Sequence, residues 1–230
     1  MDGSSTLTVV SNDLELNHLK NSIERWNRVT SAGLGIGLLQ GTRVALVPLS
    51  LEYSAELAAS ALEDRATYGF TRVPQGTEAM VEEITALLEA DDVVAFAQRD
   101  VARDRFVGMT RFMTIRSRPG ARAPYAVEIG GTWLAASAQR SGINTEAKFL
   151  LMSYAFEQWG VSRVELKTDV RNERSRAAIT RLGATFEGVL RHFQPPLVVG
   201  EEERYRDTAM FSVVDDEWLR VKSHLVSLMH

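Results

Sequence analysis

A basic turn with a single glycine precedes a long apolar segment, and its residue types suit an anion site. Backbone N–H groups at a helix N-terminus lack intrahelical partners, and the helix dipole favours negative charge there. The turn therefore predicts a phosphate-bearing ligand held mainly by the main chain. Alternatively, the glycine only eases a tight turn and the arginine is a surface charge. The turn consists of Gln139, Arg140, Ser141, Gly142, Ile143, Asn144 and Thr145, before a helix expected over 147–159.

A second candidate group, Asn172 and Ser175, follows a strand-like segment. Residues 161–169 alternate apolar and polar side chains, which is the two-residue period of a strand. Apolar residues at helical spacing come next, and Gly183 ends that short helix. Asn172 stands where a helix N-cap is expected, and capping alone would explain it.

The remaining periodicities divide most of the chain into strands and helices. Strands are expected over 43–47, 93–98, 105–115, 125–134, 161–169, 184–193 and 205–213. Helices are expected over 51–67, 77–89 and 147–159, after Asn172, and from a cap at Asp215 through Leu228. The order predicts an α/β fold whose sheet is mostly antiparallel early, with a parallel crossover through the central helix.

The first 38 residues differ from the rest. Residues 13–29 predict one helix, and residues 31–40 are rich in glycine. Three alternating glycines there superficially suggest a dinucleotide loop, but no strand precedes them and no helical pattern follows. We therefore expect residues 1–38 to be an N-terminal extension, either a linker or a packing arm, before one domain over 39–230.

The composition is that of a globular protein without thiol chemistry of its own. The chain has 230 residues, 45% hydrophobic and 24% charged, a net charge of −4 and no cysteine. Disulfides, thiolate nucleophiles and Cys-ligated zinc are excluded, and a nucleic-acid role has no electrostatic footprint. No apolar run approaches the roughly 20 residues that span a bilayer, and the N-terminus does not resemble a secretory signal. We expect a cytoplasmic protein. No metal is expected, because His18, His224 and His230 lack partners at metal-ligand spacing.

Together these motifs resemble the GNAT superfamily of acyl-CoA-dependent N-acetyltransferases, in the variant of the RimJ/RimL type. The resemblance covers residues 39–224 and is carried by segments 128–134, 139–147, 168–175 and 181–188. It implies a GNAT-like mixed α/β fold with a mostly antiparallel sheet, a central parallel crossover and flanking helices. It also implies acetyl-CoA as acyl donor and an amine acceptor, either a protein N-terminus or a small molecule, on a monomer or homodimer.

Acyl transfer from a thioester to an amine makes three chemical demands. The amine must be neutral, although free amines titrate at about 8 to 10.4. The tetrahedral oxyanion needs a hydrogen-bond donor, and the leaving thiolate benefits from a proton. A covalent enzyme intermediate is unnecessary, which is consistent with a chain that has no cysteine.

The resemblance assigns these tasks to particular residues. Glu128 is the candidate base; a cross-strand charge pair is the alternative. Asn172 would contact the pantetheine arm, and Ser175 would bond to or protonate the departing thiolate. Gly130 and Gly131 suit a β-bulge that frees an N–H toward the acyl carbonyl, or they mark plain packing. Residues expected to hold acetyl-CoA are Trp133, Leu134, Gln139, Arg140, Ser141, Gly142, Ile143, Asn144 and Thr145, with Asn172 and Ser175.

Asn144 departs from the family turn, where a small residue is usual. Its side-chain amide therefore either crowds the pyrophosphate or bonds to it.

Two alternative functions stay open. One is a non-catalytic acyl-CoA-binding module or sensor with the same fold. The other is an interaction protein whose residues 1–38 dock a partner. Asp169 is a possible second carboxylate that we expect to be structural, and His192 is expected at the surface or in packing.

Overall fold

The computed structural model describes residues 36–121, 123–198, 200–201 and 203–230. Contacts divide the chain into two units, residues 1–35 and residues 36–230, and only the second is described below. The expected helix 13–29 and nearly all of the expected extension 1–38 lie outside the described residues. Of that extension, Ile36 is buried and Leu38 is exposed.

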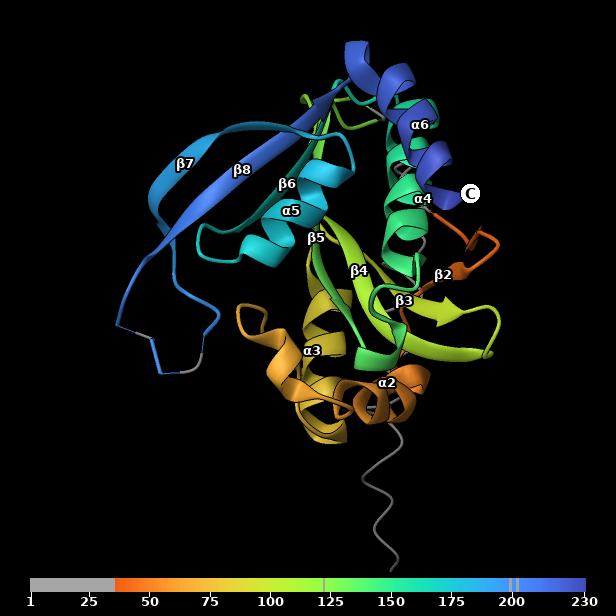
Figure 1. Ribbon diagram of the computed structural model, residues 1–230, viewed down its shortest axis with the longest axis vertical. Coiled ribbons are helices and arrows are strands. Elements are labelled where there is room, and N and C mark those ends of the chain that lie inside the picture. The colour runs from red at the N-terminus through yellow and green to blue at the C-terminus, as the bar shows by residue number, and fades with distance from the viewer. Residues whose placement is uncertain (1–35, 122, 199, 202) are drawn as a thin grey trace, which may run out of the picture. The chain divides into compact units, whose positions relative to one another are not determined.

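The described residues form one mixed sheet of eight strands, in the order β1-β2-β3-β4-β5-β6-β8-β7 (Figure 1). All neighbouring strands are antiparallel except β5 and β6, which run parallel and are joined through helix α4. This confirms the fold class expected from the sequence. The strands are β1 (Leu39–Gln40), β2 (Val44–Pro48), β3 (Val94–Asp100), β4 (Arg105–Arg116), β5 (Ala126–Leu134), β6 (Arg163–Asp169), β7 (Thr185–Gln194) and β8 (Arg206–Val214).

Helices cover both faces of the sheet. Met109 on β4 packs into the core formed with α2 and α3, whereas Phe112 on the same strand contacts Trp159 just after α4. Because successive strand residues point to opposite faces, these contacts place the two helix layers on opposite sides. The α-helices are α2 (Ser54–Ala61), α3 (Thr77–Glu89), α4 (Ile143–Glu157), α5 (Glu173–Arg181) and α6 (Asp215–Met229), with 3-10 turns η1 (Leu51–Tyr53), η2 (Arg65–Tyr68) and η3 (Ala136–Ala138).

The expected single helix over 51–67 is wrong, because the segment contains three short helices. Asp64 has an extended backbone between α2 and η2, and its carboxylate accepts a hydrogen bond from the Ala66 N–H. Aspartate competes with helix continuation by bonding to nearby backbone in this way. The break places Thr67, at the end of this segment, and Phe70, just beyond it, near the candidate site described below.

Two helix starts also differ from expectation. Helix α4 begins at Ile143 rather than near Ala147, because Gly142 adopts φ +87° and serves as the N-cap. Helix α6 begins at Asp215, so Asp215 is its first residue and Val214 is the N-cap. The Glu217 carboxylate accepts a hydrogen bond from the Val214 N–H at 3.3 Å. The starts thus follow the main-chain conformation at Gly142 and Val214.

Strands β5 and β6 separate soon after they meet, and this fork is the main irregularity of the sheet. Their parallel pairing runs only from Ala126 opposite Arg163 to Glu128 opposite Glu165. Beyond Glu128, β5 continues to Leu134 while β6 continues to Asp169 and pairs with β8. The fork therefore opens at Glu128, and helix α5 packs beside β6.

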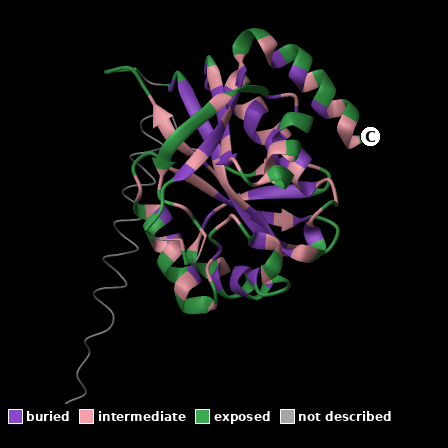
Figure 2. Cartoon of the chain, turned by 60° about the vertical axis from the view of Figure 1, so that its left-hand side comes forward, coloured by how far each residue is buried: buried purple, intermediate pink, exposed green. Residues whose placement is uncertain are grey.

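The outer strand β7 is much less buried than the strands beside it. Figure 2 shows the inner strands mostly buried and the long outer strand mostly exposed. Six large apolar side chains of this hairpin region are between 41% and 63% exposed: Phe186, Val189, Leu190, Phe193, Leu197 and Tyr205. The sheet thus ends, on the side of β6 and β8, in an exposed strand with apolar side chains.

A buried carboxylate links α4 to the first hairpin, which consists of β1 and β2. Glu146, in the first turn of α4, accepts hydrogen bonds from the backbone N–H groups of Thr42, Arg43 and Val44 at 2.7 to 3.0 Å. The Thr42 hydroxyl donates to the same carboxylate at 2.7 Å. Burial raises the pKa of Glu146, but these hydrogen bonds outweigh it and hold the pKa below its ordinary range. No local pattern in the sequence predicted this contact.

Glu146→Gln is expected to lower the free energy of unfolding at pH 7 by about 3 kcal/mol, because buried N–H groups lose a charged acceptor. A folded-state pKa below the unfolded value gives stability that is present above about 4.3 and disappears as pH falls further. Denaturant unfolding of both proteins should therefore converge near pH 3. Glu78→Gln changes an exposed acid in the first turn of α3 and is the matched control, with an effect below about 1 kcal/mol. Equal losses in both variants would contradict the assignment.

Candidate active site

The turn before α4 has the backbone of an uncapped helix N-terminus. Arg140 and Gly142 both have positive φ, +60° and +87°, and no side chain caps the helix at Gly142. The Ser141 hydroxyl is used inside the turn, where it donates to the Ala138 carbonyl at 2.5 Å. The Glu146 N–H bonds to the Gly142 carbonyl, and the Ile143 N–H donates to the Ser141 hydroxyl at 3.4 Å. The N–H groups of Asn144 and Thr145, in the first turn of α4, have no intrahelical partner, which is the arrangement that binds anions.

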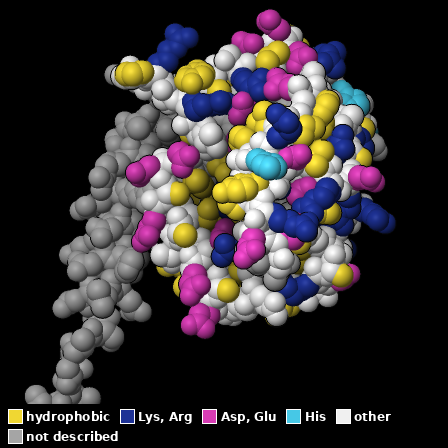
Figure 3. All heavy atoms as spheres, turned by 90° about the vertical axis from the view of Figure 1, so that its left-hand side faces the viewer, with side chains coloured by type: hydrophobic (Ala, Val, Ile, Leu, Met, Phe, Trp, Pro, Cys, Tyr) yellow, Lys and Arg dark blue, Asp and Glu magenta, His cyan; other side chains and the backbone are white. Residues whose placement is uncertain are grey.

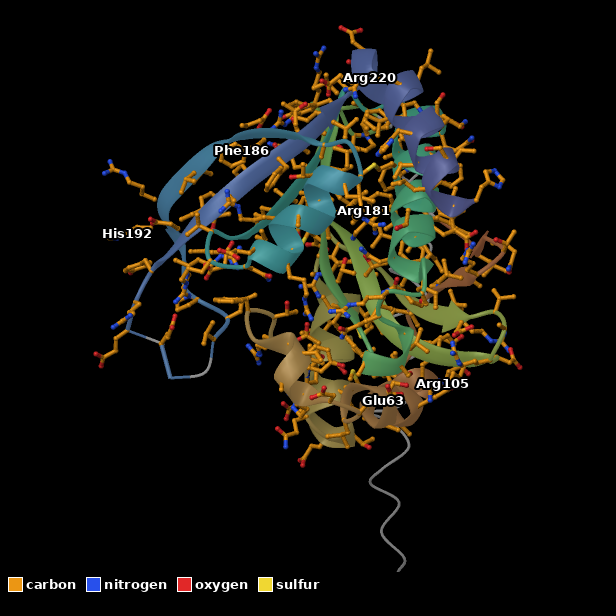
Figure 4. The ribbon with its side chains drawn as sticks, in the orientation of Figure 1. Glu63, Arg105, Arg181, Phe186, His192 and Arg220 are labelled. Atoms are coloured by element: carbon orange, nitrogen blue, oxygen red, sulfur yellow. The ribbon has the colours of Figure 1, made fainter. Side chains whose placement is uncertain are left out.

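Four arginines surround this turn. Arg140 belongs to it and is exposed, and the Arg43 side chain lies so close to Gly142 that an added Cβ there would be 3.3 Å from the Arg43 Cδ, a tight contact. From α5, Arg181 donates to the Thr145 hydroxyl at 3.2 Å, and Arg174 donates to the Gln139 side-chain carbonyl at 3.4 Å. Figure 4 shows Arg181 where α5 faces α4. The cluster adds positive charge to the helix dipole.

Sequence reasoning found only Arg140 of these four. Arg174 and Arg181 are seven residues apart, which places them on one face of a helix. The sequence shows this spacing, but it does not show which element this face of the helix packs against. Arg43 comes from the turn between β1 and β2, about 100 residues earlier in the sequence, and no local pattern indicated that it would lie here.

Gln139 uses its side chain to hold the turn in place. Its amide nitrogen donates to the Leu134 carbonyl and to the Thr67 hydroxyl, both at 3.0 Å. Arg174 also donates to the Thr67 carbonyl, so η2, the turn and α5 share one hydrogen-bond network. The Ser137 hydroxyl of η3 is hydrogen-bonded to Glu63, just after α2, and to Arg105 of β4, and Glu63 and Arg105 also form an ion pair (Figure 4).

The expected cofactor-binding residues include three with buried side chains and one, Asn144, with an unpaired polar atom. Trp133, Leu134 and Ile143 have buried side chains, and the Trp133 ring packs edge-on against Tyr68. These three can offer a ligand only main-chain groups. Asn144 lies in the first turn of α4, and its Oδ1 is buried without a hydrogen-bond partner. An unpaired buried acceptor is uncommon and suits a donor supplied by a ligand.

Asn172 and Ser175 lie at the start of α5. The Asn172 Oδ1 accepts a hydrogen bond from the Ser175 N–H at 3.0 Å, so Asn172 caps the helix. Both side chains are half-buried. The capping role expected from the sequence is therefore present, and it leaves the Asn172 amide nitrogen and the Ser175 hydroxyl for further contacts.

Glu128 sits at the fork and is bound to Lys167. The Lys167 Nζ lies 2.7 Å from Glu128 Oε2, and Thr114 donates to the same oxygen at 3.3 Å. Glu128 is 3% exposed, so it is a buried carboxylate, and its partner Lys167 is only partly buried. The cross-strand charge pair considered from the sequence exists. It fixes Glu128 at the point where β5 and β6 diverge.

Strand β5 carries the expected bulge next to Glu128. Its pairing with β4 shifts between Met109 opposite Trp133 and Arg111 opposite Gly130, which leaves one extra residue on β5. Gly131 has φ +56°, and an added Cβ there would collide with the Arg111 guanidinium at 2.5 Å. A bulge of this kind redirects main-chain N–H groups out of the ladder.

Aromatic side chains and ion pairs line the other side of the fork. The Phe193 ring lies 5.2 Å from Lys167 Nζ, and the Phe70 ring lies 5.2 Å from the Arg171 guanidinium. Asp169 is bound to Arg171 through three contacts of 2.8 to 3.0 Å, which supports its expected structural role. His192 stacks on Tyr205, as expected for packing. Figure 3 views this face, where apolar, basic and histidine side chains adjoin.

Two further findings concern the same described part of the chain. None of its helices has both the length and the apolar character needed to cross a bilayer. None of its His, Asp and Glu side chains gather in groups of three or more with the arrangement of a metal site.

Comparisons with known proteins agree with this geometry. Residues 43–185 match the family described as the acetyltransferase (GNAT) domain. A solved GCN5-related N-acetyltransferase from Brucella melitensis is 31% identical, with a TM-score of 0.72 over 84% of this chain and 85% of its own. RimJ of Mycobacterium smegmatis, solved with CoA-disulfide, shares the fold at 20% identity, with a TM-score of 0.66 over 84% of this chain and 91% of that one.

The family match covers more than half of the chain, which therefore belongs to the GNAT acetyltransferase family. This confirms the resemblance carried by the sequence motifs. A Bacillus subtilis protein named "Putative ribosomal N-acetyltransferase YdaF" is 35% identical over 88 residues. That match spans 38% of this chain and 45% of YdaF.

Proposed function

We propose that the protein transfers the acetyl group of acetyl-CoA to a primary amine, by direct attack of the amine on the thioester in a ternary complex. The observation that carries the proposal is the uncapped N-terminus of α4, surrounded by four arginines and adjoining the fork at Glu128. Membership of the GNAT family and the CoA-disulfide bound to RimJ support the choice of donor.

Each chemical demand has a candidate group in this site. The turn and its arginines bind the pyrophosphate, and the unpaired Asn144 Oδ1 accepts a hydrogen bond from an N–H or hydroxyl group of the CoA molecule. The pantetheine arm lies in the fork against Asn172, and an N–H of the bulge receives the oxyanion. Glu128 accepts the amine proton and Ser175 provides one to the thiolate.

The acceptor is a protein N-terminus or a small-molecule amine, and it enters beside Phe193 and Phe70. The name of YdaF favours ribosomal protein N-termini as the first acceptors to try. We expect the reaction to take place in the cytoplasm. The chain acts as a monomer or a homodimer.

A thiol-release assay with acetyl-CoA and a panel of amines tests the proposal, with peptides of ribosomal N-termini and small amines as acceptors. Thermal unfolding with and without CoA measures binding separately. Stabilisation together with amine-dependent thiol release supports an acetyltransferase. Stabilisation without turnover on any amine favours the alternative, a non-catalytic acyl-CoA-binding module.

Asn172→Ala and Ser175→Ala should separate by role. Loss of Asn172 removes a pantetheine contact and weakens CoA binding by about 1 kcal/mol, the usual contribution of a neutral hydrogen bond. Loss of the Ser175 hydroxyl lowers kcat with little change in CoA affinity. Because Asn172 also caps α5, Asn172→Asp is the control that keeps the cap. Unchanged kinetics in both alanine variants would leave helix capping as their only role.

A further inference from the structure

A buried lysine lies behind the bulge of β5 and has no role in the proposal above. Lys148, on the second turn of α4, is 5% exposed. Its Nζ donates to the Thr132 hydroxyl at 2.6 Å and lies 3.3 Å from the Thr110 hydroxyl. The two hydroxyls are also 2.9 Å apart. A buried ammonium is normally paired with a carboxylate, so neutral partners alone make this one unusual.

The hydrogen bonds of Lys148 lead directly to the bulge. Thr132 follows Gly131, the residue with φ +56°, and its hydroxyl lies 3.4 Å from the Gly130 carbonyl. Thr110 is the β4 residue passed over by the register shift between Met109 and Arg111. Lys148 therefore holds both strands where the ladder is interrupted.

We propose that Lys148 is a positioning residue for acyl transfer: its buried ammonium fixes the β5 bulge through Thr132 and sets a positive charge behind the oxyanion. This inference rests on the proposed function. A fixed charge in a site of low dielectric stabilises developing negative charge without reorganisation during the reaction. Lys148 touches neither substrate directly.

The charge of Lys148 depends on its surroundings. Burial lowers the pKa of Lys148 to about 7, and the nearby Glu128 carboxylate on β5 partly opposes this. Lys167 of β6 pairs with that carboxylate. On β4, the Thr110 hydroxyl lies 3.3 Å from the Lys148 Nζ, and the Arg111 guanidinium lies beside Gly131 of the bulge. Two acids of α4 itself have other partners. Glu146 binds the backbone N–H of Val44 on β2, and Glu157 pairs with Lys222 of α6. Lys148 thus carries its charge below about pH 7 and loses it above.

The test is Lys148→Met, compared with the wild type across pH 6 to 9. Methionine has a similar length, and apolar replacement of a buried charge is often neutral or stabilising. We expect kcat to fall about tenfold at pH 6 with an unchanged KM for acetyl-CoA. The ratio of wild-type to variant kcat should decline as pH rises through 7, because Lys148 loses its charge while titration of the acceptor amine cancels in the ratio. The ratio should stay above one, because methionine also lacks the hydrogen bond to Thr132. Lys222→Met, at an exposed ion pair, should leave the ratio at one throughout.

A second variant keeps the inference falsifiable if Lys148→Met does not fold. Thr132→Val retains the lysine but removes its link to the bulge, and it should lower kcat without weakening CoA binding. A pH-independent ratio in Lys148→Met, or unchanged kcat in Thr132→Val, would overturn the inference while leaving the acetyltransferase proposal intact. A wild type that binds CoA but acetylates no amine would overturn both.

Discussion

Replacing Glu128 by glutamine is expected to lower kcat by a factor on the order of 10², while CoA affinity stays unchanged. Glutamine preserves the shape of the side chain and removes only its ability to take a proton. The loss should shrink at high pH, where an amine with a pKa of about 8 to 10.4 arrives neutral without help. Steady-state kinetics of both proteins from pH 6 to 10 measures this convergence.

The ion pair with Lys167 demands a control, because Glu128→Gln also leaves that ammonium without its partner. Lys167→Met breaks the same pair from the other side, and the double variant removes both charges. If Glu128 is the base, only variants lacking Glu128 lose kcat, and the double variant does not recover. If the pair acts only as a structural link, both single variants lose stability together and the double variant regains it.

Gly142→Asp is expected to weaken CoA binding on the order of 10²-fold. A carboxylate at this N-cap lies where the pyrophosphate is proposed to bind, and repulsion between charges about 4 Å apart near a protein surface reaches several kcal/mol. Titration calorimetry with CoA measures the affinity directly, without turnover.

Gly142→Asn separates charge from strain in that experiment. Asparagine and aspartate both tolerate the left-handed conformation that Gly142 adopts at φ +87°, and they differ mainly in charge. The asparagine variant should therefore lose much less affinity than the aspartate variant. Equal affinities in the two would place the pyrophosphate elsewhere, and the Arg43 side chain beside Gly142 would then serve packing alone.

Local patterns predicted the regular elements well. Helix α3 was expected over 77–89 and is found there, because its apolar spacing is uninterrupted. The bulge at Gly130 and Gly131 and the parallel crossover through α4 were also expected and are present. In contrast, the break at Asp64 depends on one side chain competing for the backbone, which periodicity does not register.

Contacts between distant segments could not be read in the same way. Arg174 and Arg181 gain their place only because α5 lies beside the turn before α4. Lys148 lies in a helix expected to be buried, yet its partners come from two strands whose register is interrupted. The roles of Glu128, Asn172 and Ser175 stay predictions, since capping and charge pairing describe their present contacts equally well.

The Glu146 carboxylate has a consequence for the order in which a ribosome delivers this chain. The amide groups of residues 42–44 await an acceptor that lies 102 to 104 positions later. At roughly 5 to 20 residues per second, synthesis takes about 5 to 20 s to reach that acceptor. Throughout that interval the residues of the first hairpin have been synthesised, but the Glu146 carboxylate that binds them has not. The packing of this hairpin against α4 is therefore a late event of biosynthesis.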